Sequence, residues 1–275
     1  MTPREADFYV APDGSKLPRV TAILKAAYPF ANLNWSSYLA RDNTRRFAAD
    51  AYAATHPVAE GRQHCLGLDV DSFMNVLVQS QGNAPPHEAG QDSAEVGTAV
   101  HKYAEAVMRT RMGQNVRVPA LPMREIVNGQ AVASRHANAI DSFHAWLDKH
   151  AVRPASAETR LISRTHGYAG TTDLLGYVDD VFTVIDFKTS KGIFIEYPLQ
   201  LSAYGHAAVE MGLAAPPVAA AVVRFPKEAG DAFEVATFPW ELQQEYLFPL
   251  FLDAIKQWKY RQWFAEQFPY RRRPR

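Results

Sequence analysis

The chain has 275 residues, of which 47% are hydrophobic, and this is enough to bury the core of one large domain or two small ones. Its 29 basic and 29 acidic residues give no global field that attracts nucleic acid, so a polyanion must be bound by local basic patches. The single cysteine, Cys65, excludes an intramolecular disulfide, a four-thiolate zinc site and an iron–sulfur cluster.

The sequence also predicts the compartment. No stretch approaches the roughly 18 uninterrupted apolar residues that a membrane helix requires. The first ten residues have neither the apolar core of a signal peptide nor an Arg-rich, acid-poor amphipathic pattern. We therefore expect a cytoplasmic protein that makes no membrane contact.

Residues 1–92 are expected to form an N-terminal portion of helices and loops. From about Pro57 to Asp92 the sequence is rich in Gly, Pro, Gln and Asn, and Pro85-Pro86 blocks a continuous helix. Asp92 or Ser93 can then cap a helix that ends near Gly113. Its apolar residues recur at spacings of three and four, at Val96, Val100, Tyr103 and Val107.

Residues 93–239 are expected to form an α/β core. A helix over 132–150 precedes three strands over 156–164, 168–178 and 181–188, with Asp179-Asp180 as a tight turn between the last two. A helix over 196–211 and strands over 218–225 and 233–238 follow. Residues 240–275 should form a long C-terminal helix and a basic tail, and the three portions together one compact domain.

One strand carries a charged pair. Alternation along residues 184–188 sends Asp186 and Lys188 to one face, and the tight turn places Asp173 on the antiparallel neighbour. Two carboxylates on neighbouring strands suit Mg²⁺ or Mn²⁺, which accept phosphate oxygens as further ligands. Lys188 would favour formation of hydroxide and stabilise the negative charge that grows on phosphorus. The pattern therefore predicts phosphoryl-transfer chemistry with water as the nucleophile.

Other polar residues admit two interpretations. His101 projects from the edge of a buried helix face, and Gly97 on the same helix would allow a close backbone approach. A lone helical histidine is more often an ordinary surface or core residue than a ligand. The same holds for Glu158, an acidic residue on a strand that we expect to be half-buried. Gln200 and Tyr204 share one helix face, where they could hydrogen-bond a phosphate or simply form its polar side.

Considered together, these motifs resemble one family. The series GTAVH, Glu158, GTTDLLG, IDFKTSK and QLSAY resembles, in order and spacing, the RecB-type exonuclease branch of the PD-(D/E)XK nuclease superfamily from about Glu95 to Phe225. The resemblance implies a restriction-endonuclease-like core, in which helices flank a mixed central sheet in αβββαβ order. It also implies a metal-dependent exonuclease, with no iron–sulfur cluster because the four cysteines of several relatives are absent.

The resemblance also implies a role for each residue. The metal ligands would be His101, Asp173, Asp186 and the backbone carbonyl of Phe187. Lys188 would assist the nucleophilic water, Glu158 would orient a ligand or a water, and Gln200 and Tyr204 would position the phosphate. The segment Leu17–Leu24 is similar to an N-terminal segment of cluster-free phage exonucleases and of the mitochondrial genome maintenance exonuclease.

Two segments interleave aromatic and basic residues. The first, with Trp35, Tyr38, Arg41, Arg45 and Arg46, could grip phosphates while bases stack, or could be a solvated helix face. In the second, Trp258, Tyr260, Trp263 and Phe264 surround Arg261, and we expect these aromatic residues to pack in the core. The terminal arginines could contact DNA or form a solubilising tail.

The function that these residues favour is a Mg²⁺- or Mn²⁺-dependent deoxyribonuclease. We expect an exonuclease on single-stranded DNA ends in repair, recombination or phage DNA processing, in a bacterial or phage-infected cell. A helicase or recombination protein could be its partner, and residues 1–92 would supply elements of a DNA channel. The alternatives are a flap or junction endonuclease of the same fold, and a non-catalytic DNA-binding module. A zinc hydrolase is disfavoured because no HExxH motif is present among the nine histidines and the single cysteine has no partner.

Overall fold

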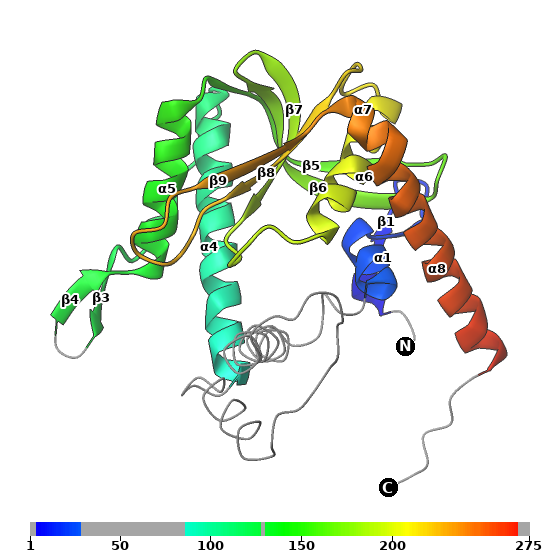
Figure 1. The fold of residues 1–275 in the computed structure, drawn as a ribbon, viewed down its shortest axis with the longest axis horizontal. Helices are drawn as coiled ribbons and strands as arrows, with labels where there is room; N and C mark the ends of the chain where they lie inside the picture. The colour runs from blue at the N-terminus through cyan, green and yellow to red at the C-terminus, as the bar shows by residue number, and fades with distance from the viewer. Residues whose placement is uncertain (1–3, 29–85, 128–129, 269–275) are drawn as a thin grey trace, which may run out of the picture. The chain divides into compact units, whose positions relative to one another are not determined.

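The computed structural model describes residues 4–28, 86–127 and 130–268 (Figure 1). The chain divides into two compact units, one made of Met1–Ala31 with Glu95–Arg275 and the other of Asn32–Ala94. All the strands described below belong to the first unit. Among the helices of the described residues, none is both long enough and apolar enough to cross a bilayer.

A five-stranded mixed sheet forms the centre of the first unit, in the order β5-β6-β7-β8-β9. The first three strands form an antiparallel meander, β8 is parallel to β7, and β9 is antiparallel to β8. Because β7 and β8 are parallel, the chain must cross over between them, and α6, Glu196–Glu210, makes this crossover. The strands are β5 Val152–Ser163, β6 Tyr168–Val178, β7 Val181–Lys188, β8 Ala219–Arg224 and β9 Glu234–Phe238.

The turn between β6 and β7 fixes the register of the sheet. Asp179 and Asp180 both have left-handed backbone conformations, with φ of 49° and 67°, as a two-residue hairpin turn of type I′ requires. Asp179 Oδ1 accepts a hydrogen bond from the Ala151 N–H, and Oδ2 lies 2.6 Å from Nδ1 of His150. The predicted hairpin is confirmed, and β6 and β7 have the bounds expected from the sequence.

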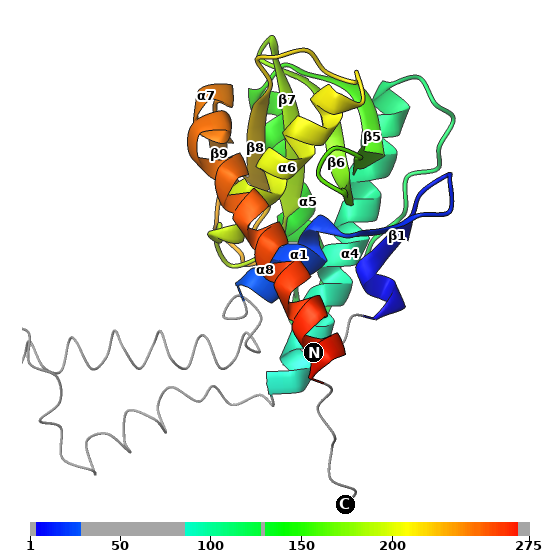
Figure 2. The same cartoon turned by 90° about the vertical axis from the view of Figure 1, so that its right-hand side faces the viewer.

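Helices cover both faces of the sheet (Figures 1 and 2). On one face, α4, Pro86–Arg111, and α5, Arg135–Lys149, pack against Ile185 and Phe187 of β7. On the other face, α6 and two further helices pack against Val184 of β7 and Val222 of β8. These two helices are α1, Val20–Ala27, and α8, Phe248–Gln267. The alternation of β7 therefore leaves Asp186 and Lys188 on the α6 side.

Two helices begin at residues other than those predicted. Helix α5 starts after Ser134, whose Oγ accepts a hydrogen bond from the Ala137 N–H at 3.1 Å, and not at Val132. Residues 130–133 instead form β4, Gln130–Ala133, which pairs with β3, Arg124–Val127. Helix α4 starts at Pro86, six residues before the predicted cap, since proline is tolerated at the first helical position.

The described ends of the chain also differ from the predictions. After a 3₁₀ turn, Glu5–Asp7, strands β1, Phe8–Val10, and β2, Lys16–Pro18, form a hairpin before α1. The predicted long C-terminal helix is confirmed, since residues 240–267 are helical without a break; it consists of α7, Trp240–Leu242, a π-helical turn, Gln243–Leu247, and α8. Trp258 is buried as expected, but Tyr260, Trp263 and Phe264 are exposed, so the predicted packing is wrong for these three.

Candidate active site

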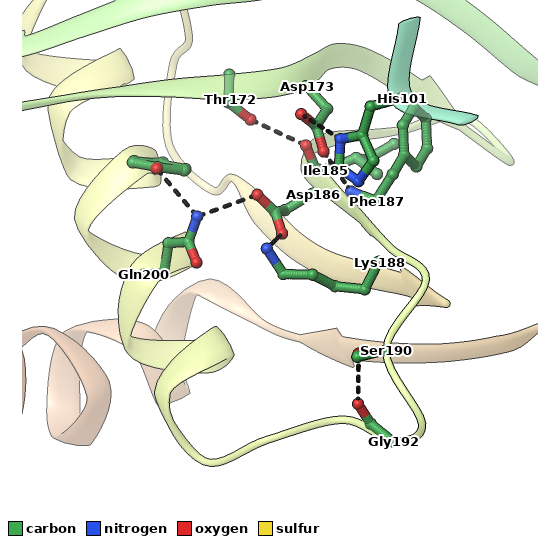
Figure 3. A network of polar contacts seen from close by, with 11 residues as sticks. His101, Thr172, Asp173, Ile185, Asp186, Phe187, Lys188, Ser190, Gly192 and Gln200 are labelled. Atoms are coloured by element: carbon green, nitrogen blue, oxygen red, sulfur yellow. Dashed lines mark hydrogen bonds and ion pairs between the residues drawn. The ribbon is translucent and has the colours of Figure 1, made fainter. Parts of the chain in front are cut away.

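The candidate site lies where β6 and β7 separate (Figure 3). Backbone pairing between the two strands ends at Leu174 and Ile185. Beyond this pair, Thr172 Oγ1 donates to the Ile185 carbonyl at 2.9 Å, and the Asp173 carboxylate accepts from the Phe187 N–H at 2.5 Å. Side chains of β6 thus replace the backbone ladder and satisfy the buried polar groups of β7.

Three acidic residues occupy one row across this part of the sheet. Continuing the observed register places Glu158 of β5 opposite Asp173, and Asp173 opposite Asp186. Glu158 has φ of 50°, which interrupts the pairing between β5 and β6, and its side chain stays exposed. Partial desolvation and the nearby Asp173 and Glu105 raise the pKa of Glu158 to about 7. The row therefore concentrates negative charge.

Two cationic side chains compensate this charge. The Lys188 ammonium forms an ion pair with Oδ2 of Asp186, and Nδ1 of His101 on α4 lies 3.4 Å from Oδ1 of Asp173. Burial opposes the charged form of both groups, but the neighbouring carboxylates prevail and raise the pKa of Lys188 and of His101. The Lys188 Nζ also lies 4.6 Å from the centroid of the Tyr197 ring on α6, at cation–π distance.

The carboxyls of half-buried Asp173 and buried Asp186 respond differently to this environment. Burial is the largest effect on each of them and favours the protonated form. For Asp186 burial prevails and raises the pKa, although Lys188 opposes it. For Asp173 the charges of His101 and Lys188, together with the hydrogen bond from Phe187, prevail over burial and lower the pKa. The pair therefore combines one carboxyl that ionises easily with one that does so less easily.

Helix α6 supplies two more polar groups. Gln200 Nε2 lies within hydrogen-bond distance of Asp186 Oδ1, at 3.1 Å, and of the Tyr204 hydroxyl, at 3.0 Å. The Tyr204 ring packs directly on β6, where a Cβ at Gly170 would lie 2.3 Å from it. A Cβ at Gly97 of α4 would lie 2.9 Å from Thr189 Oγ1. Both motif glycines are therefore needed for close approach, as predicted for Gly97.

A cavity of about 240 Å³ opens beside these residues. One wall contains Asp173, Asp186, Gln200 and Tyr204, and the N-terminal segment forms the other with Tyr9, Arg19 and Thr21. The sequence analysis did not assign these three residues, although the motif Leu17–Leu24 contains two of them. Tyr9 bridges the walls, since its hydroxyl lies 2.7 Å from Thr171 Oγ1, and the guanidinium of Arg19 lies 4.4 Å from its ring centroid.

The loop after Lys188 is anchored by a buried arginine that the sequence analysis did not identify. Arg224, at the end of β8, donates to the Ser190 carbonyl at 3.1 Å and to both carboxylate oxygens of Glu234 at 2.9 and 2.7 Å. The Phe225 N–H donates to the Lys188 carbonyl at 2.7 Å. Strand β8 thereby fixes the backbone on which Lys188 is carried.

The donor chemistry of the site suits a hard divalent cation. Two carboxylates and an imidazole lie together, and the buried Oδ2 of Asp186 has the Lys188 ammonium as its partner. The Phe187 carbonyl points to the β6 side, because its N–H bonds Asp173 and the Lys188 carbonyl bonds β8. The present arrangement is not a ligand sphere: within the described ranges, no three His, Cys, Asp or Glu side chains are placed to hold an ion. Ion binding therefore requires these side chains to exchange partners.

The structure thus brings most of the predicted site residues together. His101, Asp173, Asp186, Lys188, Gln200 and Tyr204 form one connected cluster, and Glu158 lies at its exposed edge. The residues predicted to bind DNA lie outside the described residues; they are Trp35, Tyr38, Arg41, Arg45 and Arg46.

Comparison with known families identifies the fold. A model described as the PD-(D/E)XK nuclease superfamily matches residues 76–275, which is more than half of the chain. The chain belongs to this superfamily. As a PD-(D/E)XK protein it is a nuclease, a hydrolase of phosphodiester bonds, and this fold implies DNA as the substrate class. The predicted fold and family are confirmed.

The other comparisons add little to this membership. No curated protein matches the PD-(D/E)XK chain. Among solved structures it is similar to the crystal structure of an alkaline exonuclease from Laribacter hongkongensis, with 11% sequence identity and a TM-score of 0.27. The match covers 66% of this chain and 87% of the other, and a likeness this low carries no functional conclusion.

Proposed function

We propose that the protein is a Mg²⁺- or Mn²⁺-dependent deoxyribonuclease that hydrolyses phosphodiester bonds at the ends of single-stranded DNA. The observation that carries the proposal is the cluster where β6 and β7 separate, in which half-buried Asp173 and buried Asp186 adjoin Lys188 within a nuclease fold. Paired carboxylates with an adjacent amine are suited to phosphoryl transfer, in which catalysis depends on positioning and charge stabilisation.

Each residue of the cluster has a proposed task. Asp173, Asp186, the His101 imidazole and the Phe187 carbonyl would hold the ion. When bound, the ion would supply positive charge that polarises the phosphate and favours ionisation of the attacking water. Lys188 would stabilise the charge that develops on phosphorus, and Gln200 and Tyr204 would position the phosphate from α6. Glu158, at the edge of the row, would orient a ligand or a water.

The shape of the cavity supports a preference for single strands. A cavity of about 240 Å³ between the sheet and the N-terminal segment has room for a phosphate group and part of a nucleotide. A single strand can bend its backbone into such a cavity, whereas the base pairs of a duplex hold both strands on a rigid cylinder. A need for free single strands in turn suggests work in repair, recombination or phage DNA processing, with a helicase or recombination protein exposing the strand.

The proposal is tested by digestion of end-labelled single-stranded DNA with Mg²⁺, Mn²⁺ or chelator. Wild type should cut in either metal and not in chelator. Asp186→Asn and Lys188→Ala should each lower the rate by at least about a hundredfold, since each removes a charge that acts on the transition state. Circular dichroism and melting temperature serve as the control for folding.

The substrate identifies the mode of attack. A strict exonuclease degrades a linear strand and leaves a circular strand intact, and it should spare blunt duplex. Cutting of the circle, or of flaps and junctions in preference to ends, would instead identify a structure-specific endonuclease of the same fold. If wild type binds DNA but cuts no substrate in either metal, the protein is a non-catalytic binding module and the proposal is wrong.

A further inference from the structure

Four aromatic side chains are exposed at the C-terminal end of α8, three of them within the helix and the fourth, Phe268, at the residue that follows it. Tyr260, Trp263, Phe264 and Phe268 are each between 46% and 61% exposed, although aromatic rings of this size are usually buried. Phe251, Ala254 and Trp258 of the same helix are buried. A cluster of exposed rings, in contrast to a single one, marks a surface that binds something.

The helix arranges these rings in one continuous stripe. They follow one another at spacings of three, one and four residues, so they share the face opposite the buried residues. The ring centroids of Tyr260 and Trp263 lie 5.9 Å apart, those of Tyr260 and Phe264 6.0 Å, and those of Phe264 and Phe268 4.9 Å. We call this set of four residues the α8 stripe.

Positive charge surrounds the α8 stripe. Exposed Lys259 and Arg261 flank it on its two sides, and Lys256, one helical turn before it, is paired with Asp253 at 2.9 Å. Among the described residues from Lys256 onward three are basic and one, Glu266, is acidic, in a protein whose net charge is zero. A surface for another protein's apolar face would not need this charge, whereas a polyanion does.

We propose that the α8 stripe binds single-stranded nucleic acid, with bases stacked on its rings and phosphates beside its lysines and arginine. A single strand offers unstacked base faces, which a duplex hides between its own base pairs. Helix α1, whose first turn lines the cavity, packs along α8, so stripe and cavity are parts of one compact unit (Figure 1). The inference rests on the proposed function for its purpose: the stripe would hold the strand whose end is being cut.

The binding is measured by fluorescence anisotropy of a labelled oligothymidylate in the presence of chelator, so that no cleavage takes place. The double variant Trp263→Ala/Phe264→Ala should bind at least about tenfold more weakly than wild type, since each stacked ring contributes to affinity. Trp263→Phe should retain most of the affinity. Leu250→Ala, which removes an exposed apolar side chain from α8 outside the stripe, should bind as wild type does.

The contribution of the flanking basic residues, Lys259 and Arg261, is measured separately, by the salt dependence of binding. The double variant Lys259→Gln/Arg261→Gln should reduce the slope of log affinity against log salt by about 0.7 for each charge removed, as expected for phosphate contacts to a single strand. The α8 stripe is not a nucleic-acid site if folded ring variants bind with unchanged affinity. It is an interface between two copies of the chain if those variants instead abolish self-association in the ultracentrifuge.

These outcomes are separable from a failure of the proposed function. If the ring variants lose binding and wild type still fails to cut with Mg²⁺ or Mn²⁺, then the nuclease proposal falls and the binding site stands. If wild type cuts and the ring variants bind and cut as it does, the nuclease proposal stands and the α8 stripe has no role in binding the strand.

Discussion

Asp173 and Asp186 lie in the same row of the sheet, yet their surroundings act on them differently. Asp173 receives the Phe187 N–H and adjoins His101, whereas Asp186 depends on Lys188 and Gln200. The position of the lysine is therefore central to the charge balance of the site. It is set by the strand that carries it, by the ion pair, and by the Tyr197 ring against its Nζ.

The contact between Lys188 and Tyr197 gives a prediction at the residue scale. Tyr197→Leu should lower the single-turnover cleavage rate about fivefold to tenfold, because a cation–π contact of about 1 kcal/mol no longer holds the ammonium in place. Tyr197→Phe keeps the ring face and should cleave at the wild-type rate. Equal losses in both variants would assign the effect to the tyrosine hydroxyl and contradict the cation–π contact as the cause.

At the scale of elements, His206 of α6 is packed between two rings of the C-terminal helices. Its ring stacks on Phe248 at 3.7 Å and on Trp240 at 4.6 Å, and its Nδ1 lies 2.9 Å from the Ser202 carbonyl. Burial disfavours the imidazolium and lowers the pKa of His206 below its usual value of 6.5, although the Ser202 carbonyl opposes this. The unfolded chain therefore takes up a proton at a higher pH than the folded protein.

The consequence is a pH dependence of stability. Because the folded-state pKa of His206 is depressed, its contribution is complete above pH 6.5 and is lost as the pH falls toward the folded-state value. Melting temperatures measured at about pH 8 and about pH 5.5 should therefore differ less for His206→Phe, which stacks but does not titrate, than for wild type. An identical pH dependence in the two proteins would show that the packing of His206 against Phe248 and Trp240 tolerates the charged imidazolium.

The elements differ in how far the sequence predicts them. The bounds of β6 and β7 follow from the two aspartates of the turn between them, and the predicted bounds of α6 differ from the observed ones by one residue. The hairpin of β3 and β4 could not be found in this way, because all residues of β4 are exposed and no alternation of burial marks it. The start of α5 depends on the Ser134 cap, which the continuing apolar pattern concealed.

At the scale of the whole molecule, the site combines parts that the sequence does predict with parts that it does not. Local motifs indicated His101, Asp173, Asp186 and Lys188, because their chemistry and spacing are distinctive. The opposite wall of the cavity comes from residues 9–21, more than 140 positions before the β6 residues it faces, and this proximity exists only in the folded chain. Arg224 was not predicted either, because it stands at the end of an otherwise apolar strand.

Ion binding should be visible as a change in the stability of the whole protein. Free Mg²⁺ or Mn²⁺ at about 100 times its dissociation constant should stabilise the folded chain by about 2.7 kcal/mol, since the ion binds the folded state. The melting temperature of wild type should therefore rise with added metal, and that of Asp186→Asn should not. A rise of the same size in both proteins would locate the ion away from this carboxylate.

The separation of β6 from β7 has a practical consequence for anyone who needs an inactive form of the protein. Because the Asp173 side chain serves as the hydrogen-bond acceptor for the Phe187 amide, replacing it by alanine removes a ligand candidate and a structural bond at once. Asparagine keeps an oxygen for that amide and discards the charge alone. Loss of activity in an alanine mutant at this position would thus say nothing about chemistry until the asparagine mutant had been compared with it.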